Sequence, residues 1–166
     1  MTRTTPRIAT VRVAPPSALL IDWTNGGVDH VELAGWIATG GDVLAALRDR
    51  AVFASAHPIE FGSAVGFGDD DDDDLAIDAI HLQKIAAEQL PFSGGDLAAW
   101  QAVERLSNNE AADLLGIGLS TFNAYKAGTS KIPDVVAIAC RAISRDPTIK
   151  HAHLKPRKAG RPRKTA

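Results

Sequence analysis

The stretch from Ser107 to Gly128 constrains the fold of this chain more than any other part of the sequence. Ser107 is followed three residues later by Glu110, which is the spacing of a capping box, in which each side chain bonds the other's free backbone N–H at a helix start. Gly116 and Gly128 lie where short helices would end, and glycine accepts the left-handed backbone that closes a helix. The sequence therefore predicts a first helix of about two turns, a tight turn, and a second helix over 119–127.

Three residues in this stretch have the spacing of a helix-turn-helix. Ala112 is small where the two helices would cross, Gly116 falls in the turn, and Phe122 is an apolar plug between the helices. The pattern resembles the helix-turn-helix of the phage-repressor-like regulators (lambda repressor, XRE type). Two departures are visible, because Gly118 stands where a capping Ser is usual and Phe122 replaces Ile or Val. The alternative is an ordinary helical hairpin in a core.

The resemblance implies that the second helix binds in the major groove of double-stranded DNA. Asn123 is the strongest candidate for reading a base, because its amide can both donate to and accept from adenine. Ser120 and Thr121 could bond phosphate or cap the helix, and Leu119 and Ala124 could contact a thymine methyl. The residues expected to contact the DNA backbone are Lys126, Thr129, Ser130 and Lys131.

Charge is divided unevenly along the chain. The whole sequence has 18 Lys and Arg against 20 Asp and Glu, a net charge of −2. From Leu97 onward there are 12 basic and 5 acidic residues, a net charge of +7, and the remainder carries −9. A basic second half suits a DNA-binding domain. In the first half, six consecutive aspartates at 69–74 predict a solvated loop. The run lacks the glycine and the distal Glu of a calcium site. Alternatively, the aspartates could compete with DNA for the basic half.

Residues 155–166 form a basic tail that we expect to be disordered alone, because it has no apolar residue beyond alanine to bury. The segment from Lys158 to Lys164, KAGRPRK, resembles an AT-hook, which implies that its Gly-Arg-Pro core lies in the narrow minor groove of A·T tracts. Arg161, Arg163 and Lys164 are then candidate DNA contacts. A nonspecific basic tail that adds affinity by counterion release is an equal alternative.

The first ninety residues predict an α+β fold, a small and mostly antiparallel sheet with short helices. Asn25-Gly26 between two apolar runs is a strong hairpin signal. The expected strands are 8–13, 19–23, 28–33, 52–59 and 64–67, and the expected helices are a turn at 35–41, 43–48 with Asp42 as its cap, and 77–90 with an apolar stripe of Ile77, Ile80, Ile85 and Leu90. That stripe could pack in the core or pair with a second copy.

A second resemblance covers residues 8–80. The Asn-Gly hairpin, the Val-Glu-Leu at 31–33 and the Leu-Arg-Asp at 47–49 before a Phe-bearing strand resemble a small bacterial domain of unknown function, DUF2442. That family usually has a Trp where Phe67 stands. Members that carry this domain before a phage-repressor-like helix-turn-helix resemble the whole chain, and some such domains are thought to lie beside toxin partners. The resemblance implies DNA binding through the second half and leaves the role of the first half open.

The predicted organisation has four parts: an α+β domain at 1–90, a linker at 91–95, an all-α helix-turn-helix domain at 96–154, and the tail. Around the two short helices we expect a helix from a cap at Asp96 through Leu106, one at 134–143 and a short one ending near Leu154. Their expected buried residues are Leu97, Trp100, Val103, Leu106, Val135, Val136, Ala139, Cys140 and Ile143.

The sequence has no pattern typical of an enzyme. Its histidines have no metal-ligand or acid–base spacing, there is no phosphate-binding loop, and the lone Cys140 has no His or acid arranged near it. We expect no cofactor and no metal. No apolar run approaches the ~20 residues of a membrane span, and Met1 begins no signal peptide, so a cytoplasmic, nucleoid-associated protein is expected.

Three functions fit these observations. The first is a transcriptional regulator, a repressor that binds DNA as a homodimer. The second is an antitoxin-like protein whose first domain binds a protein partner while the helix-turn-helix autoregulates its operon. The third, a small-molecule sensor, requires a pocket that sequence cannot show.

Overall fold

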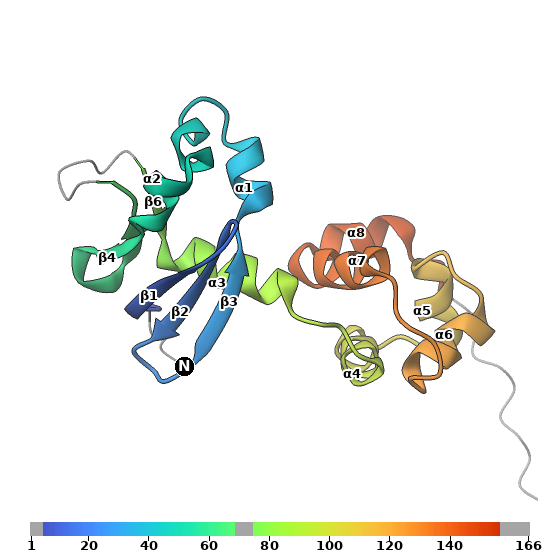
Figure 1. The fold of residues 1–166 in the computed structure, drawn as a ribbon. Coiled ribbons are helices and arrows are strands. Elements are labelled where there is room, and N and C mark those ends of the chain that lie inside the picture. The colour runs from blue at the N-terminus through green and yellow to red at the C-terminus, as the bar shows by residue number, and fades with distance from the viewer. Residues whose placement is uncertain (1–4, 69–74, 157–166) are drawn as a thin grey trace, which may run out of the picture. The chain divides into compact units, whose positions relative to one another are not determined.

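The computed structural model describes residues 5–68 and 75–156 (Figure 1). The chain divides into two compact units, Met1–Leu90 and Pro91–Ala166, called here the first and the second unit. The first unit combines antiparallel sheets with short helices, and the described part of the second is helical. The predicted α+β fold class is confirmed.

The first sheet of the first unit has the strand order β1-β2-β3, with both pairs antiparallel. The strands are β1 (Ile8–Ala14), β2 (Ala18–Trp23) and β3 (Val28–Glu32). The hairpin between β2 and β3 turns at Gly26, whose φ of +89° is in the left-handed region, and pairs Leu19 with Val31. The three strands and the Asn-Gly hairpin predicted here are confirmed.

The second sheet has the order β4-β5-β6 and is also antiparallel. Its strands are β4 (His57–Ile59), β5 (Ala64–Gly66) and β6 (Ala76–Asp78). The prediction of one strand over 52–59 is wrong in its first half, where the chain forms helix α2 (Arg50–Ala54). The Asp49 side chain accepts the Ala51 N–H and so starts the helix, and this cap outweighs the strand preference of the Val-Phe pair that follows.

The remaining helices of the first unit are α1 (Ala34–Thr39), the 3₁₀ turn η1 (Ala45–Arg48) and α3 (Ala79–Gln89). The predicted helix 43–48 is shorter than expected, and Asp42 contributes its carbonyl to Ala45 N–H instead of a side-chain cap.

The predicted helix 77–90 begins two residues late. Ile77 belongs to β6, and Asp78 caps α3 by accepting the His81 N–H at 2.8 Å. The predicted apolar stripe is therefore wrong in part, because Ile80 and Leu90 are exposed while Leu82 and Ala86 are buried.

The core of the first unit lies between the strands and α3. Phe53 and Phe67 stack with ring centroids 5.5 Å apart. The Gln89 side chain bonds the backbone of Glu32 twice, at 2.9 Å and 2.7 Å, and so fastens the end of α3 to β3. Fully buried members of this core are Leu19, Ile21, Val31, Leu33, Val65, Phe67 and Leu82.

A turn between β4 and β5 has an unusual backbone. The short segment η2 (Glu60–Gly62) places three successive residues at positive φ: +48° at Glu60, +57° at Phe61 and +78° at Gly62. The first two are not glycines, so each adopts a backbone that disfavours its Cβ. Phe61 projects from this turn with its surface fully exposed, at 100%.

The second unit contains α4 (Gly94–Glu104), α5 (Asn108–Leu114), α6 (Leu119–Lys126), α7 (Asp134–Arg145) and α8 (Pro147–His153). Their inner faces form one core. Its buried residues are Leu97, Trp100, Leu106, Ala111, Ala112, Phe122, Ile132, Val136, Cys140 and Ile143.

Two details of this unit differ from the sequence prediction. Ser93, not Asp96, caps α4, and Asp96 closes the capping box from the third helical position, so the helix begins within the predicted linker. Val103 and Val135 are exposed, at 74% and 69%, instead of buried. On α4 the inner face carries Leu97 and Gln101, four residues apart, and Val103 falls outside that stripe.

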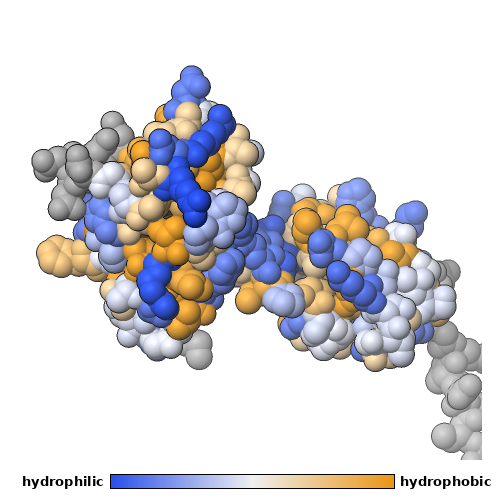
Figure 2. All heavy atoms as spheres, viewed as in Figure 1, coloured by the Kyte–Doolittle hydropathy of each residue, from blue (hydrophilic) through white to orange (hydrophobic). Residues whose placement is uncertain are grey.

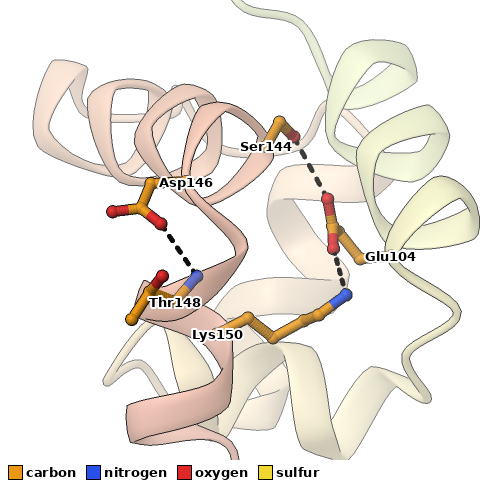
Figure 3. Close-up of polar contacts among 5 residues, drawn as sticks. All are labelled: Glu104, Ser144, Asp146, Thr148 and Lys150. Atoms are coloured by element: carbon orange, nitrogen blue, oxygen red, sulfur yellow. Dashed lines mark hydrogen bonds and ion pairs between the residues drawn. The ribbon is translucent and has the colours of Figure 1, made fainter.

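Polar contacts join α4 to the last two helices, as Figure 3 shows. Glu104 on α4 accepts from the Lys150 ammonium at 2.5 Å and from the Ser144 hydroxyl at 3.3 Å. Asp146 caps α8 by accepting the Thr148 N–H at 2.9 Å, and bonds with Thr148 hold the pKa of Asp146 below its usual value. These contacts fix the helical support behind α5 and α6.

In the space-filling view, hydrophobic and hydrophilic residues are mixed over the visible face of each unit (Figure 2). The described residues contain no helix long and apolar enough to cross a membrane.

Candidate nucleic-acid interface

The helix α5 starts with the capping box that the sequence predicted. The Ser107 hydroxyl accepts the Glu110 N–H at 3.3 Å, and the Glu110 carboxylate accepts the Ser107 N–H at 2.9 Å. Two otherwise unpaired N–H groups at the helix start are thus satisfied within four residues of chain.

Both α5 and α6 end in the same hydrogen-bonded turn. Gly116 has a φ of +68°, and the Ile117 N–H reaches back to the Ala112 carbonyl at 3.0 Å. Gly128, with a φ of +70°, repeats this arrangement at the end of α6. These are Schellman motifs, in which left-handed glycines let the last carbonyls find donors. The sequence prediction of two helices ended by these glycines is confirmed.

The two helices pack through small and apolar residues. Phe122 of α6 has no exposed surface, and Ala111 and Ala112 of α5 are buried beneath it. Gly118 precedes α6 without a side-chain cap, and its carbonyl accepts the Phe122 N–H at 2.9 Å. Phe122 and Ala112 are therefore both buried in the core of the second unit.

The opposite side of α6 faces outward. Leu119, Ser120 and Asn123 are exposed, while Thr121 and Ala124 are partly buried. Beyond the helix, Thr129, Ser130 and Lys131 are exposed, and the Thr129 hydroxyl donates to the Ala124 carbonyl at 3.1 Å. The first group forms one surface at the start and middle of α6.

Asn123 is joined to a set of polar side chains behind it. Its Oδ1 accepts from Asn108 Nδ2 on α5 at 2.9 Å. Asn108 Oδ1 in turn accepts from Gln101 Nε2 on α4 at 2.8 Å. Gln101 is only 8% exposed, so the outward-facing amide of α6 is connected to a buried amide of the supporting helix.

Lys126 points back toward this set. Its ammonium donates to Gln101 Oε1 at 2.6 Å and to Asn108 Oδ1 at 3.3 Å, and it lies 5.7 Å from the Phe122 ring centroid. The sequence suggested Lys126 as a DNA-backbone contact, and in the structure its charge is engaged within the protein. Gln101 and Asn108 were not predicted; a polar residue on the apolar face of α4 was the available signal for Gln101.

Three of the predicted contacts, Arg161, Arg163 and Lys164, lie outside the described residues, as does the aspartate run 69–74. The basic residues of this tail nevertheless set the net charge of the second unit. Residues 91–156 hold seven Lys and Arg and six Asp and Glu, so the basic excess of the second unit belongs to residues 157–166, with five Lys and Arg and no acid.

Cys140 is a buried thiol in the core of the second unit. Burial raises the pKa of the Cys140 thiol to about 12, which keeps it protonated and unreactive at neutral pH. Within residues 5–68 and 75–156, no group of three or more His, Cys, Asp or Glu could hold a metal ion. Two surface hollows of about 360 and 380 Å³ in the first unit share Pro16, Leu47 and Arg48.

No family model matches the chain, and no curated protein matches it either. The resemblance of residues 8–80 to DUF2442 therefore rests on the quoted residues alone. A solved structure from Nitrosomonas europaea, named a "putative DNA binding protein", is 23% identical, with 94% of this chain and 96% of that chain covered and a TM-score of 0.44.

Proposed function

We propose that this protein is a sequence-specific DNA-binding transcriptional regulator whose α5 and α6 form a helix-turn-helix. The observation that carries the proposal is the two-sided character of α6. Phe122 is fully buried on one side, while Leu119, Ser120 and Asn123 are exposed on the other. A recognition helix needs this combination, since one face must be anchored and the other must reach base edges.

The proposed contacts divide into two groups. Side chains on the outer face of α6 contact bases in the major groove, and Thr129, Ser130 and Lys131 contact the phosphate backbone. Because residues 91–156 are nearly neutral in charge, the basic segment 157–166 supplies most of the electrostatic attraction, with Arg161, Arg163 and Lys164 in the minor groove. The protein acts without catalysis, as a homodimeric repressor in the cytoplasm.

The proposal is tested by selecting bound fragments from sheared genomic DNA with the purified full chain. An enriched inverted repeat is expected, because two copies would bind half-sites about one helical turn apart. Asn123→Ala should lose discrimination between the enriched site and random DNA, whereas Lys84→Ala, an exposed change on α3, should behave as wild type. Absence of any enriched sequence would refute the proposal.

The tail is tested separately. Removal of residues 157–166 should reduce the dependence of affinity on salt, because every phosphate that the protein neutralises adds about 0.9 to the slope of log K against log salt. Fluorescence anisotropy with the selected site at several salt concentrations measures that slope. An unchanged slope would exclude the tail from the DNA contact.

The second candidate function is an antitoxin-like protein, and the Phe61 turn favours it. A fully exposed aromatic side chain is the kind of residue that anchors a protein interface. In this function the first unit binds a protein partner, and the second unit autoregulates the operon. Phe61→Ala should abolish co-purification of the partner from the source cells and leave DNA binding unchanged. Equal recovery of the partner with wild type and with Phe61→Ala would count against the antitoxin-like function.

A further inference from the structure

The side-chain amides behind α6 have a defined orientation. Gln101 provides the starting point, because its two ends meet groups that cannot exchange roles. Its Nε2 lies 2.9 Å from the Leu106 carbonyl, which only accepts, and its Oε1 lies 2.6 Å from the Lys126 ammonium, which only donates. Turning this amide over would set two donors against each other and two acceptors against each other.

Asn108 is oriented by the same two residues. Gln101 Nε2 at 2.8 Å and the Lys126 ammonium at 3.3 Å both point at one atom of its amide. Both neighbours are donors, so that atom is Oδ1 and the other is Nδ2. Asn108 Nδ2 then donates to Asn123, and the receiving atom of Asn123 is its oxygen.

The orientation of Asn123 follows from this chain of contacts. Its Oδ1 is turned toward Asn108 and accepts one hydrogen bond from it, and no hydrogen bond within the described chain involves its Nδ2, which has two N–H donors. The exposed outer face of α6 therefore presents a donor at this position. The usual pairing of Asn with adenine also needs the amide oxygen to face the base, and here that oxygen faces Asn108. Guanine presents two acceptors in the major groove, N7 and O6, which the two N–H groups of Nδ2 match.

We propose that Gln101, Asn108 and Lys126 are positioning residues that set the base preference of Asn123, and that this preference is for guanine. The inference rests on the proposed function and changes the adenine expected from sequence. Lys126 accordingly acts from inside the protein as the donor that sets the polarity of the amides, and it does not bind phosphate.

Asn108→Asp is the decisive variant. Aspartate has the same shape as asparagine and still accepts from Gln101 and Lys126, but its second oxygen can only accept. Asn123 must then turn its amide over to donate inward, which presents Oδ1 to the DNA. An acceptor at this position favours the amino groups of adenine and cytosine.

The measurement is the base preference at each position of the selected site, determined with the full chain. Wild type should show one guanine whose preference is lost in Asn123→Ala, and Asn108→Asp should replace that guanine with adenine or cytosine. Relative preference is compared because the added negative charge lowers affinity for every sequence. Thermal unfolding should confirm that the variant is folded.

Lys126→Met separates positioning from phosphate binding. It should weaken the guanine preference and leave the salt slope of binding unchanged, whereas Lys131→Met should lower the slope by about 0.9 and keep the preference. A lowered slope in Lys126→Met, or a guanine preference retained in Asn108→Asp, would overturn the inference while the proposed function stands. Failure of wild type to enrich any sequence would overturn the proposed function, and this inference with it.

Discussion

Two turns in this molecule use left-handed backbone in different ways. In the second unit the turn between α5 and α6 places a glycine, Gly116, at the positive φ, with nothing within 4 Å of the Cβ that it lacks. In the first unit the turn between β4 and β5 places Glu60 and Phe61 at positive φ ahead of Gly62. One turn has the residue that its backbone prefers, and the other does not.

The difference lies in what stabilises each turn. The Gly116 turn is closed by hydrogen bonds to residues at most five positions away. The Glu60 turn has local bonds from Ser63 to the Glu60 carbonyl and carboxylate, at 3.2 Å and 2.9 Å. It is also held from outside, because Arg7 Nη1 donates to the Glu60 carbonyl at 3.1 Å and to the Phe61 carbonyl at 3.4 Å. The Gly116 turn is stabilised by bonds within its own stretch of sequence, whereas the Glu60 turn needs a distant part of the unit in addition to its local bonds.

The largest effect is expected from the phenylalanine near each turn. Phe122 is fully buried and Phe61 fully exposed. Phe122→Ala should lower the free energy of unfolding of the second unit by about 3–5 kcal/mol, the usual cost of truncating a buried Phe. Phe61→Ala should change the stability of the first unit by less than about 0.5 kcal/mol. Hydrogen exchange read by mass spectrometry reports each unit separately in the full chain, and similar effects of the two variants would contradict the described burial.

The second prediction compares the glycines. A Cβ on Gly62 would lie 2.2 Å from the Ile8 carbonyl oxygen, and its φ is +78°. Gly62→Ala should therefore destabilise the first unit by about 2–4 kcal/mol, because backbone strain and a backbone clash add. Gly116→Ala, at φ +68° with open space around it, should destabilise the second unit by only about 1–2 kcal/mol. Urea unfolding followed by hydrogen exchange measures both values, and an equal cost would show that Ile8 moves aside.

These two turns also show which parts of the fold could be predicted from the sequence. The capping box at Ser107, the glycine ends of α5 and α6 and the buried Phe122 were predicted correctly, because each depends on residues within a few positions. The strand expected at 52–59 was wrong in its first half, since the cap at Asp49 starts a helix there. The Glu60 turn could not be predicted, because part of its support comes from Arg7, more than fifty residues away.

In the candidate site, too, contacts between residues distant in sequence could not be predicted. Asn123 was predicted from its place on α6, and the structure puts it on the exposed face. Its partners could not be predicted, because Gln101 and Asn108 meet it only after α4, α5 and α6 have packed. Lys126 was expected to contact the DNA backbone, and its bond to Gln101 could not be predicted because the two residues are 25 positions apart in sequence.

The third prediction concerns the turn at the end of α4 in the second unit, where glycine would fit the backbone better than the residue present. Arg105, at the end of α4, is a non-glycine residue at φ +56°, in the position where glycine closes α5 and α6. Arg105→Gly should stabilise the second unit by about 1 kcal/mol, because the left-handed strain disappears. Arg145→Gly, inside the last turn of α7, should instead destabilise by a similar amount. Thermal unfolding of both variants tests the signs, and a destabilised Arg105→Gly would mean that the arginine side chain itself holds the turn.

The smallest expected effect is the loss of stability at acid pH. It compares a carboxylate bonded by a distant residue with one bonded by a near neighbour. A hydrogen bond from Ser17, fifteen residues away, is the main cause that holds the pKa of Glu32 below its ordinary value. The pKa of Asp96 is also lowered from its ordinary value, and there the main cause is the hydrogen bond from Ser93, three residues away.

A carboxylate with a lowered pKa in the folded state stabilises the fold above its unfolded pKa, and this contribution is lost as the pH falls through the folded pKa. Both contributions should therefore be present at pH 7 and disappear below about pH 4. Ser17→Ala and Ser93→Ala should each raise the pKa of the paired carboxylate toward its ordinary value, as measured by NMR titration of the full chain.

At a urea concentration that unfolds the first unit, Glu32 should titrate at its ordinary pKa, because its partner Ser17 is brought close only by the paired strands β2 and β3. The bond between Ser93 and Asp96 needs only the first turn of α4, so Asp96 should keep part of its shift for as long as that turn persists. If both carboxylates returned to their ordinary pKa at the same urea concentration, the capping box of α4 would depend on packing as much as the contacts of the first unit do.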